Sequence, residues 1–240
     1  MTKALILAGG RGKRLGNLTE STNKCLLELR GKPVLEYNLE RVCGLEGIKD
    51  IIIVVGHRAE DIINRYGTEY KGKRIQYVIQ HEQRGLVHAI ECAREKIGKD
   101  DFFLLLGDEV LVNARAKEML EKFNSEGLFG ICGGVWQKDI AKISRTYSVL
   151  MDGDNVILRL IEKPKKALNN WQGTGHCILR NGILDYIPRT PIHPERGEKE
   201  LPDLLQCATD DGRKIKLFDF ADSYTNINSN EDLQEAKAMV

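Results

Sequence analysis

A short apolar segment that runs directly into glycines and cations constrains this chain more than any other feature. Residues 4–8 have the length and composition of a buried β-strand. Glycines let backbone N–H groups approach phosphate oxygens closely, and Arg and Lys neutralise the charge of those oxygens. The pattern therefore predicts a strand that ends in a loop for a polyphosphate. The glycines are Gly9, Gly10 and Gly12, and the cations beside them are Arg11, Lys13 and Arg14.

Spacing excludes two well-known phosphate loops. A Walker A loop requires Gly-x-x-x-x-Gly-Lys-Ser/Thr, but Lys13 is followed by Arg14 and the residue five before Gly12 is Leu7. The dinucleotide fingerprint requires Gly-x-Gly-x-x-Gly, but its third glycine position is Leu15. Taken alone, the segment leaves a second interpretation open, namely a glycine-rich turn with solvated cations.

The order of apolar and helical patterns predicts an α/β fold. Strand patterns alternate with helix patterns in the first half, whereas the second half is richer in strands. Such alternation indicates βαβ units, so we expect one Rossmann-like domain with a mixed, mostly parallel sheet and helices on both faces. Ligands of such sheets lie beyond the carboxyl ends of the strands. The expected strands are residues 4–8, 51–55, 75–79, 101–106, 129–136, 148–151, 156–161, 175–179 and 215–218, and the expected helices are 59–66, 85–97, 182–186, 201–208 and 230–239.

Composition argues against several other classes of protein. The net charge is +1 and the cations are spread along the chain, which disfavours a nucleic-acid-binding surface. The 6 cysteines include no Cys-x-x-Cys pair, so we expect reduced thiols in a cytoplasmic protein. No apolar run approaches the ~20 residues of a membrane span, and residues 4–8 are too short for the core of a signal peptide.

The N-terminal motif resembles the signature of the sugar-1-phosphate nucleotidyltransferases, and most closely that of the glucose-1-phosphate thymidylyl- and uridylyltransferases. The resemblance implies that Arg14 and Lys24 stabilise the reacting phosphates. Two neighbours depart from the family pattern, because Lys13 replaces the usual Thr and Asn23 replaces the usual Pro. The resemblance also implies that the nucleoside triphosphate is held by Leu7, Ala8, Gly9, Gly10 and Gly12.

A second match concerns the base of the nucleotide. Gln80 is followed five residues later by Gly85, which begins Gly-Leu-Val-His-Ala. In relatives that use dTTP or UTP, this Gln bonds the pyrimidine edge and this Gly approaches the base. A Gln amide offers both a donor and an acceptor, which suits uracil or thymine. A flipped amide pairs with cytosine instead, and a surface Gln before a polar turn is the structural alternative.

Asp108 and Asn226 are the expected metal ligands. Asp108 follows the strand pattern at residues 101–106, and an Asp there holds the catalytic Mg²⁺ in the family. Asn226 stands where the family has a second Asp, so we expect weaker Mg²⁺ binding. A strand followed by a helix capped by Asn228 or Ser229 also accounts for that segment. The pattern assigns no role to Glu109, beside Asp108.

The sugar phosphate is expected to contact Gly107, Glu162, Lys163 and Gly175. The sequence Glu-Lys-Pro at 162–164 matches a family motif in which the Glu binds sugar hydroxyls and the Lys contacts the phosphate, and Lys163 is therefore a third catalytic candidate. Gly175 matches a glycine on which a hexose lies. The next residues, His176 and Cys177, replace the usual Ile and Tyr, so the acceptor pocket need not hold plain glucose.

Together these matches indicate an enzyme that condenses a sugar 1-phosphate with UTP or dTTP and releases pyrophosphate. We expect one catalytic domain over residues 1–240, with a nucleotide-binding half at about 1–112 and a sugar-phosphate-binding half at about 113–240. Mg²⁺ is the expected cofactor, and the expected partners are small-molecule substrates, with a homo-oligomer as a further expectation. Two alternatives stay open: a cytidylyltransferase for a non-hexose phosphate or phosphonate, and a non-catalytic paralogue that binds nucleotide-sugars.

Overall fold

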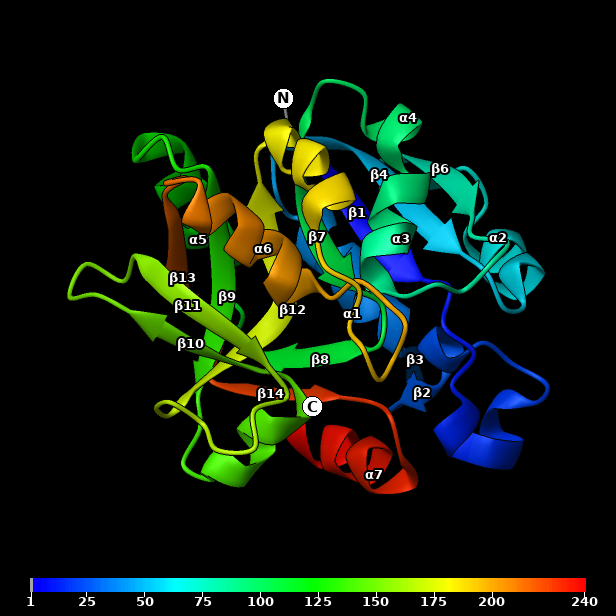
Figure 1. The fold of residues 1–240 in the computed structure, drawn as a ribbon. Helices are drawn as coiled ribbons and strands as arrows, with labels where there is room; N and C mark the ends of the chain where they lie inside the picture. Colours follow the sequence, from blue (N-terminus) through cyan, green and yellow to red (C-terminus); the bar gives the residue numbers. More distant parts are fainter. Residues whose placement is uncertain (1) are drawn as a thin grey trace.

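Four parallel strands form the centre of this computed structural model, which describes residues 2–240 (Figure 1). Their order in space is β7, β1, β4 and β6, and every neighbouring pair is parallel. β1, β4 and β7 consist mostly of buried apolar residues, as expected where helices cover both faces of a sheet, whereas β6 also contains Lys73, Arg74 and Gln76 and is only partly buried. The four strands are β1 (Thr2–Ala8), β4 (Ile48–Val55), β6 (Lys73–Ile79) and β7 (Asp101–Leu106).

The second half of the chain extends this sheet with antiparallel strands. β12 (Trp171–Leu179) is antiparallel to β7 and to β9 (Gly130–Trp136). The result is a ten-stranded mixed sheet with a mostly parallel centre, which confirms the expected fold class. Its other members are β5 (Glu69–Tyr70), β10 (Tyr147–Met151), β11 (Ile157–Glu162) and β13 (Ile215–Asp219).

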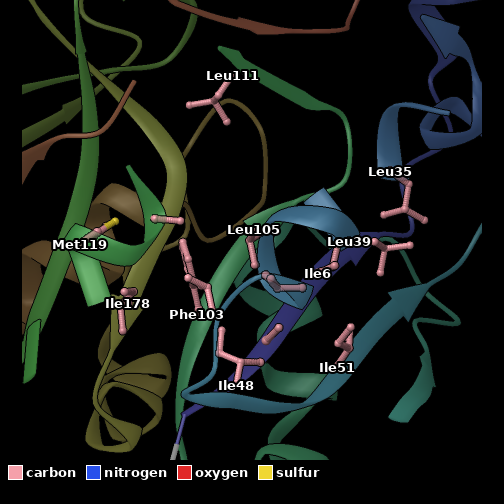
Figure 2. Close-up of a cluster of buried hydrophobic side chains, with 14 of the residues drawn as sticks. Ile6, Leu35, Leu39, Ile48, Ile51, Phe103, Leu105, Leu111, Met119 and Ile178 are labelled. Atoms are coloured by element: carbon pink, nitrogen blue, oxygen red, sulfur yellow. The ribbon is translucent and has the colours of Figure 1, made fainter. Parts of the chain in front are cut away.

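Alternate residues of the central strands point to opposite faces and build two separate cores. Ile6 packs among side chains of α1 (Val34–Cys43), α2 (Ala59–Tyr66) and α5 (Ala116–Ser125), as Figure 2 shows for part of this cluster. Leu5 packs on the other face, which is covered by α3 (Leu86–Cys92), α4 (Arg94–Ile97), α6 (Leu201–Asp210) and the 3₁₀ helix η4 (Asn181–Arg189). Helices thus cover both faces of the sheet.

The C-terminal segment folds back against the glycine-rich loop. β14 (Ser223–Asn226) pairs with β8 (Glu109–Val112), directly after β7. α7 (Asn230–Met239) follows and begins with a capping box between Ser229 and Asp232, so Ser229 is the cap. A third apolar cluster joins this region to the loop through Leu15, Val110, Ile227 and Leu233. The remaining elements are η1 (Lys13–Thr19), η2 (Lys24–Leu26), η3 (Ile140–Arg145), β2 (Glu28–Leu29) and β3 (Lys32–Pro33).

Several elements differ from the sequence-based expectation. Helices α1 and α5 were not expected, although each buries one apolar face. The expected helix at 85–97 is two helices, because the backbone turns at Ala93, which ends α3 and precedes α4. The expected helix at 182–186 is a longer 3₁₀ helix, η4, which contains Pro188. Within residues 2–240, no helix has the length and apolarity needed to cross a membrane.

Candidate active site

The carboxyl ends of β1, β6 and β7 place three of the predicted segments at one edge of the sheet. The glycine-rich loop follows β1, Gln80 follows β6, and Gly107 and Asp108 follow β7. Backbone hydrogen bonds continue past the strands, since the N–H of Gly107 donates to the carbonyl of Leu7 at 2.9 Å. The N–H of Gln80 donates to the carbonyl of Val55 at 2.7 Å. The parallel register therefore fixes the separation of these segments.

Asn23 braces the position of Lys24. Its buried side chain accepts the N–H of Cys25 at 2.9 Å and donates to the carbonyls of Ala8 and His57 at 3.1 and 2.7 Å. A proline, the usual residue at this position in the pattern, has no side-chain donor for these contacts. The replacement by Asn therefore ties the start of η2 to the end of β1.

Lys24 and Asp108 form an ion pair beneath the loop. The ammonium contacts Asp108 Oδ2, and the two side chains are only 10% and 16% exposed. Burial lowers the pKa of Lys24, but the charge and hydrogen bond of Asp108 and the neighbouring Cys25 together raise it, and the net pKa lies above its ordinary value. Lys24 therefore carries its positive charge at the end of β7.

Two side-chain hydrogen bonds connect Arg14 to Asn226 through Asn228. Arg14 Nη2 donates to Asn228 Oδ1 at 2.8 Å, and Asn228 Nδ2 donates to Asn226 Oδ1 at 2.9 Å. Arg14 lies on η1, immediately after the glycines, whereas Asn226 ends β14. The cation of the loop and the candidate metal ligand are thus separated by a single side chain.

The oxygens of Asp108 and Asn226 suit a hard cation. Asn226 is opposite Glu109 in the β8–β14 ladder, and the N–H of Ile227 donates to the carbonyl of Asp108 at 3.0 Å. The two candidate ligands therefore come from the turn just before β8 and from the end of its partner strand β14. No cluster of three or more His, Cys, Asp or Glu side chains suitable for a metal occurs in residues 2–240. Two protein oxygens completed by substrate phosphates and water match Mg²⁺, which seldom takes an all-protein cage.

Gln80 is held by two partners just after β6. Its Nε2 lies 3.1 Å from the carbonyl oxygen of Gly85 and 3.0 Å from Nδ1 of His88. Gly85 has φ +89°, which disfavours any other residue, and an added Cβ would lie 2.8 Å from a carboxylate oxygen of Glu198. The loop before α6 therefore packs directly on the glycine that precedes α3.

A cavity of about 670 Å³ lies beside these groups, at the antiparallel end of the sheet. Its lining includes residues predicted to bind the sugar phosphate, and it also includes Arg14 and Asn226. The predicted residues that line it are Arg14, Glu162, Lys163, Gly175 and Asn226. The other predicted residues do not line it, but two of their neighbours do, namely Leu86, next to Gly85, and Glu109, next to Asp108.

Glu162 and Lys163 lie next to an arginine that the sequence patterns missed. Lys163 Nζ is 3.3 Å and Arg196 Nη2 is 3.6 Å from Glu162 Oε1, and Arg196 Nε is 2.7 Å from Glu200. Burial, followed by the charge of Glu200, raises the pKa of Glu162 to about 7. The spacing of Arg196 and Glu200, four residues apart, was the only signal in the sequence.

Glu109 anchors a buried polar network under the cavity. Its carboxylate accepts the N–H of Gly175 at 3.0 and 3.1 Å, the hydroxyl of Tyr224 at 2.7 Å and Nδ1 of His176 at 2.8 Å. Burial lowers the pKa of His176, although Glu109 opposes this. An added Cβ at Gly175 would lie 2.3 Å from Leu106, so glycine is required by close packing.

Comparison with known proteins identifies the family. The family model described as nucleotidyl transferase matches residues 3–239. The chain belongs to this family. The match covers both ends of the sheet, from the glycine-rich loop to α7.

Two nucleotidyl transferases of the archaeon Haloferax volcanii are similar to this chain. One is the UTP–glucose-1-phosphate uridylyltransferase AglF, 32% identical over 98% of this chain and 95% of the relative. The other is the low-salt glycan biosynthesis nucleotidyltransferase Agl11, 31% identical over 99% of this chain but only 66% of the relative. The chain therefore spans nearly all of one relative and just under two thirds of the other.

A solved member of the nucleotidyl transferase fold aligns over the same length. A crystal structure from Bacillus anthracis, described as a putative glucose-1-phosphate thymidylyltransferase in complex with sucrose, superposes with a TM-score of 0.88 at 24% identity. The alignment covers 99% of this chain and 94% of that one. At this identity, the likeness establishes the shared fold.

Proposed function

We propose that this protein transfers a nucleotidyl group from UTP or dTTP to a sugar 1-phosphate and releases pyrophosphate. The observation that carries the proposal is the arrangement of charge around the cavity. Arg14, which lines the cavity, and Lys24 supply cations beside the glycine-rich loop, whereas Lys163, which also lines the cavity, and Arg196 supply cations around Glu162. Two phosphorylated substrates brought together in one reaction require two such groups of cations. The names of AglF and of the thymidylyltransferases among the relatives support this assignment.

The proposed reaction is a single displacement. An oxygen of the sugar phosphate attacks the α-phosphorus, and the bond from that phosphorus to the bridging oxygen of the β-phosphate breaks. Pyrophosphate leaves with the electron pair of the broken bond, and no covalent bond to the protein forms. Catalysis of this kind depends on positioning and on stabilising charge as it develops.

Each side chain has a defined part in this scheme. Arg14 and Lys24 neutralise the triphosphate, and Lys163 with Arg196 holds the phosphate of the acceptor. The Glu162 carboxylate accepts hydrogen bonds from sugar hydroxyls. Asp108 and Asn226 would hold Mg²⁺, which supplies further charge neutralisation on the phosphates when bound.

A matrix of nucleotides and acceptors tests the proposal. Pyrophosphate release is measured for UTP, dTTP, CTP, ATP and GTP against a panel of sugar 1-phosphates, at saturating Mg²⁺. We expect turnover with UTP or dTTP to exceed turnover with either purine nucleotide. Preference for CTP with a non-sugar phosphonate would favour the cytidylyltransferase. Absence of turnover, with nucleotide-sugar binding retained, would favour the non-catalytic paralogue.

We further propose that the protein acts in the cytoplasm on freely diffusing substrates. Its six cysteines are free thiols, which suits a reducing compartment. Assembly into a homo-oligomer and the division into halves near residue 112 stay predictions.

A further inference from the structure

Both amide hydrogens of Gln80 already have acceptors within the protein. Gln80 is 5% exposed, and its Nε2 faces the carbonyl oxygen of Gly85 and the Nδ1 of His88 at 3.1 and 3.0 Å. A carbonyl can only accept, so Gly85 requires the NH₂ group on this side of the amide. The amide oxygen then points the other way, where an added Cβ on Gly9 would lie 3.1 Å from it.

His88 satisfies this arrangement in only one tautomer. If Nδ1 accepts from Gln80, the hydrogen lies on Nε2, which faces Cys92 Sγ at 3.6 Å. Arg84 Nη2 also lies 2.8 Å from that Nε2, and a hydrogen bond from Arg84 would demand the opposite tautomer. His88 Nδ1–H would then require the oxygen of Gln80, and this oxygen would face the carbonyl of Gly85.

The Gly85 carbonyl and the Arg84 side chain favour opposite orientations of the Gln80 amide, and the more rigid of the two decides between them. The Gly85 carbonyl is part of the backbone at the start of α3, where it also accepts the N–H of Ala89 at 3.2 Å. The Arg84 side chain is 65% exposed and has a second partner in Glu82 at 3.3 Å. Since an exposed Arg can turn away and a helix-terminal carbonyl cannot, the amide keeps its NH₂ group toward Gly85 and His88.

We propose that His88 is a positioning residue that presents only the oxygen of Gln80 to the nucleotide base. This inference rests on the proposed function. Uracil and thymine carry N3–H, which pairs with such an acceptor, whereas cytosine has a lone pair at N3. To pair with N3 of cytosine, Gln80 must turn its amide and give up both His88 and Gly85. His88 therefore contributes to the choice of UTP or dTTP over CTP.

Substitutions at His88 test this role. In His88→Leu the amide keeps only Gly85, so turning it costs one hydrogen bond less. We expect the ratio of kcat/KM for UTP to that for CTP to fall about fivefold, the value of one buried hydrogen bond. The KM for the sugar 1-phosphate should not change. His88→Asn should restore the ratio. Asn Oδ1 is the same number of bonds from the backbone as His Nδ1, and it also accepts a hydrogen bond.

Arg84→Ala is the matched control, and it should leave the ratio at the wild-type value. Calorimetric binding of UTP and of CTP to the same variants, without acceptor, separates this inference from the proposed function. Wild-type protein without turnover would count against the function, while the binding ratio would still report on His88. The inference is overturned if His88→Leu keeps the wild-type ratio. It is equally overturned if His88→Asn matches His88→Leu, or if Arg84→Ala alone lowers the ratio.

Discussion

Lys24 and Asp108 form the ion pair that links the start of η2 to the turn after β7. Their side chains are 10% and 16% exposed, so neither charge is well solvated. The carboxylate is also the candidate metal ligand, and the ammonium is a candidate phosphate contact. In the proposed enzyme, each partner therefore stabilises the charge of the other until the substrates arrive.

Removing one partner of this ion pair should lower the free energy of unfolding. Lys24→Met leaves the Asp108 carboxylate buried without a counter-ion, and we expect a loss of about 3 kcal/mol in the free energy of unfolding. The double variant Lys24→Met/Asp108→Asn should recover part of that loss. Urea unfolding without nucleotide or Mg²⁺ measures both. Arg74→Met, at an exposed pair with Asp50, should cost less than about 1 kcal/mol. Equal costs at Lys24 and Arg74 would contradict the buried role.

Arg14→Ala should lower kcat by about 10²–10³ without altering the fold, because a positioned cation is lost where charge develops. Steady-state pyrophosphate release and circular dichroism are the measurements. Lys13→Ala removes the neighbouring exposed cation and is expected to retain most of the activity. Near-normal turnover in a folded Arg14→Ala protein would refute the proposed part of Arg14 in catalysis.

The sheet was predictable from sequence because its strands are apolar runs that follow one another at βαβ spacing. The same runs locate the loop, Gln80 and Asp108, since parallel strands end at one edge. Helix α1 was not expected, although its first residue, Val34, follows directly after Pro33 and its apolar residues bury one face.

Partners that are distant in sequence could not be predicted. Glu109 and His176 are 67 residues apart, and neither a helical nor a strand period connects them. The network under Gly175 exists because β12 pairs with β7, and the chain continues from the end of β7 into Glu109 at the start of β8. The contact between Arg14 and Asn228 spans 214 residues and depends likewise on how α7 packs on the loop.

Asn226→Asp should lower the Mg²⁺ concentration that gives half-maximal activity. A carboxylate adds charge where the present amide supplies only an oxygen, and Mg²⁺ binds mainly through carboxylates and phosphates. A Mg²⁺ titration of turnover at fixed substrate concentrations measures the effect. Asn230→Asp, which adds the same charge at an exposed position on α7, should leave the titration unchanged. An unchanged midpoint in Asn226→Asp would remove Asn226 from the metal site.

Titration of Glu162 should make the free energy of unfolding depend on pH. In the folded protein its pKa is raised from 4.5 to about 7, so the folded state binds more protons than the unfolded state between these values. Stability therefore falls as pH rises through this window, by about 3 kcal/mol in total. Glu162→Gln cannot ionise and should be more stable than wild type at pH 8, with no such advantage at pH 4. Urea unfolding at both pH values measures this difference.

The same carboxyl group should also affect acceptor binding. Ionised Glu162 accepts hydrogen bonds from sugar hydroxyls with both oxygens, whereas the protonated form has less acceptor capacity. The KM for the sugar 1-phosphate should therefore fall as pH rises through about 7 in wild type. In Glu162→Gln that dependence should shrink to whatever titration of the acceptor phosphate contributes. Glu46→Gln, at an exposed site remote from the cavity, should follow the wild-type profile. If Glu162→Gln keeps the full pH dependence, the carboxyl group does not face the sugar.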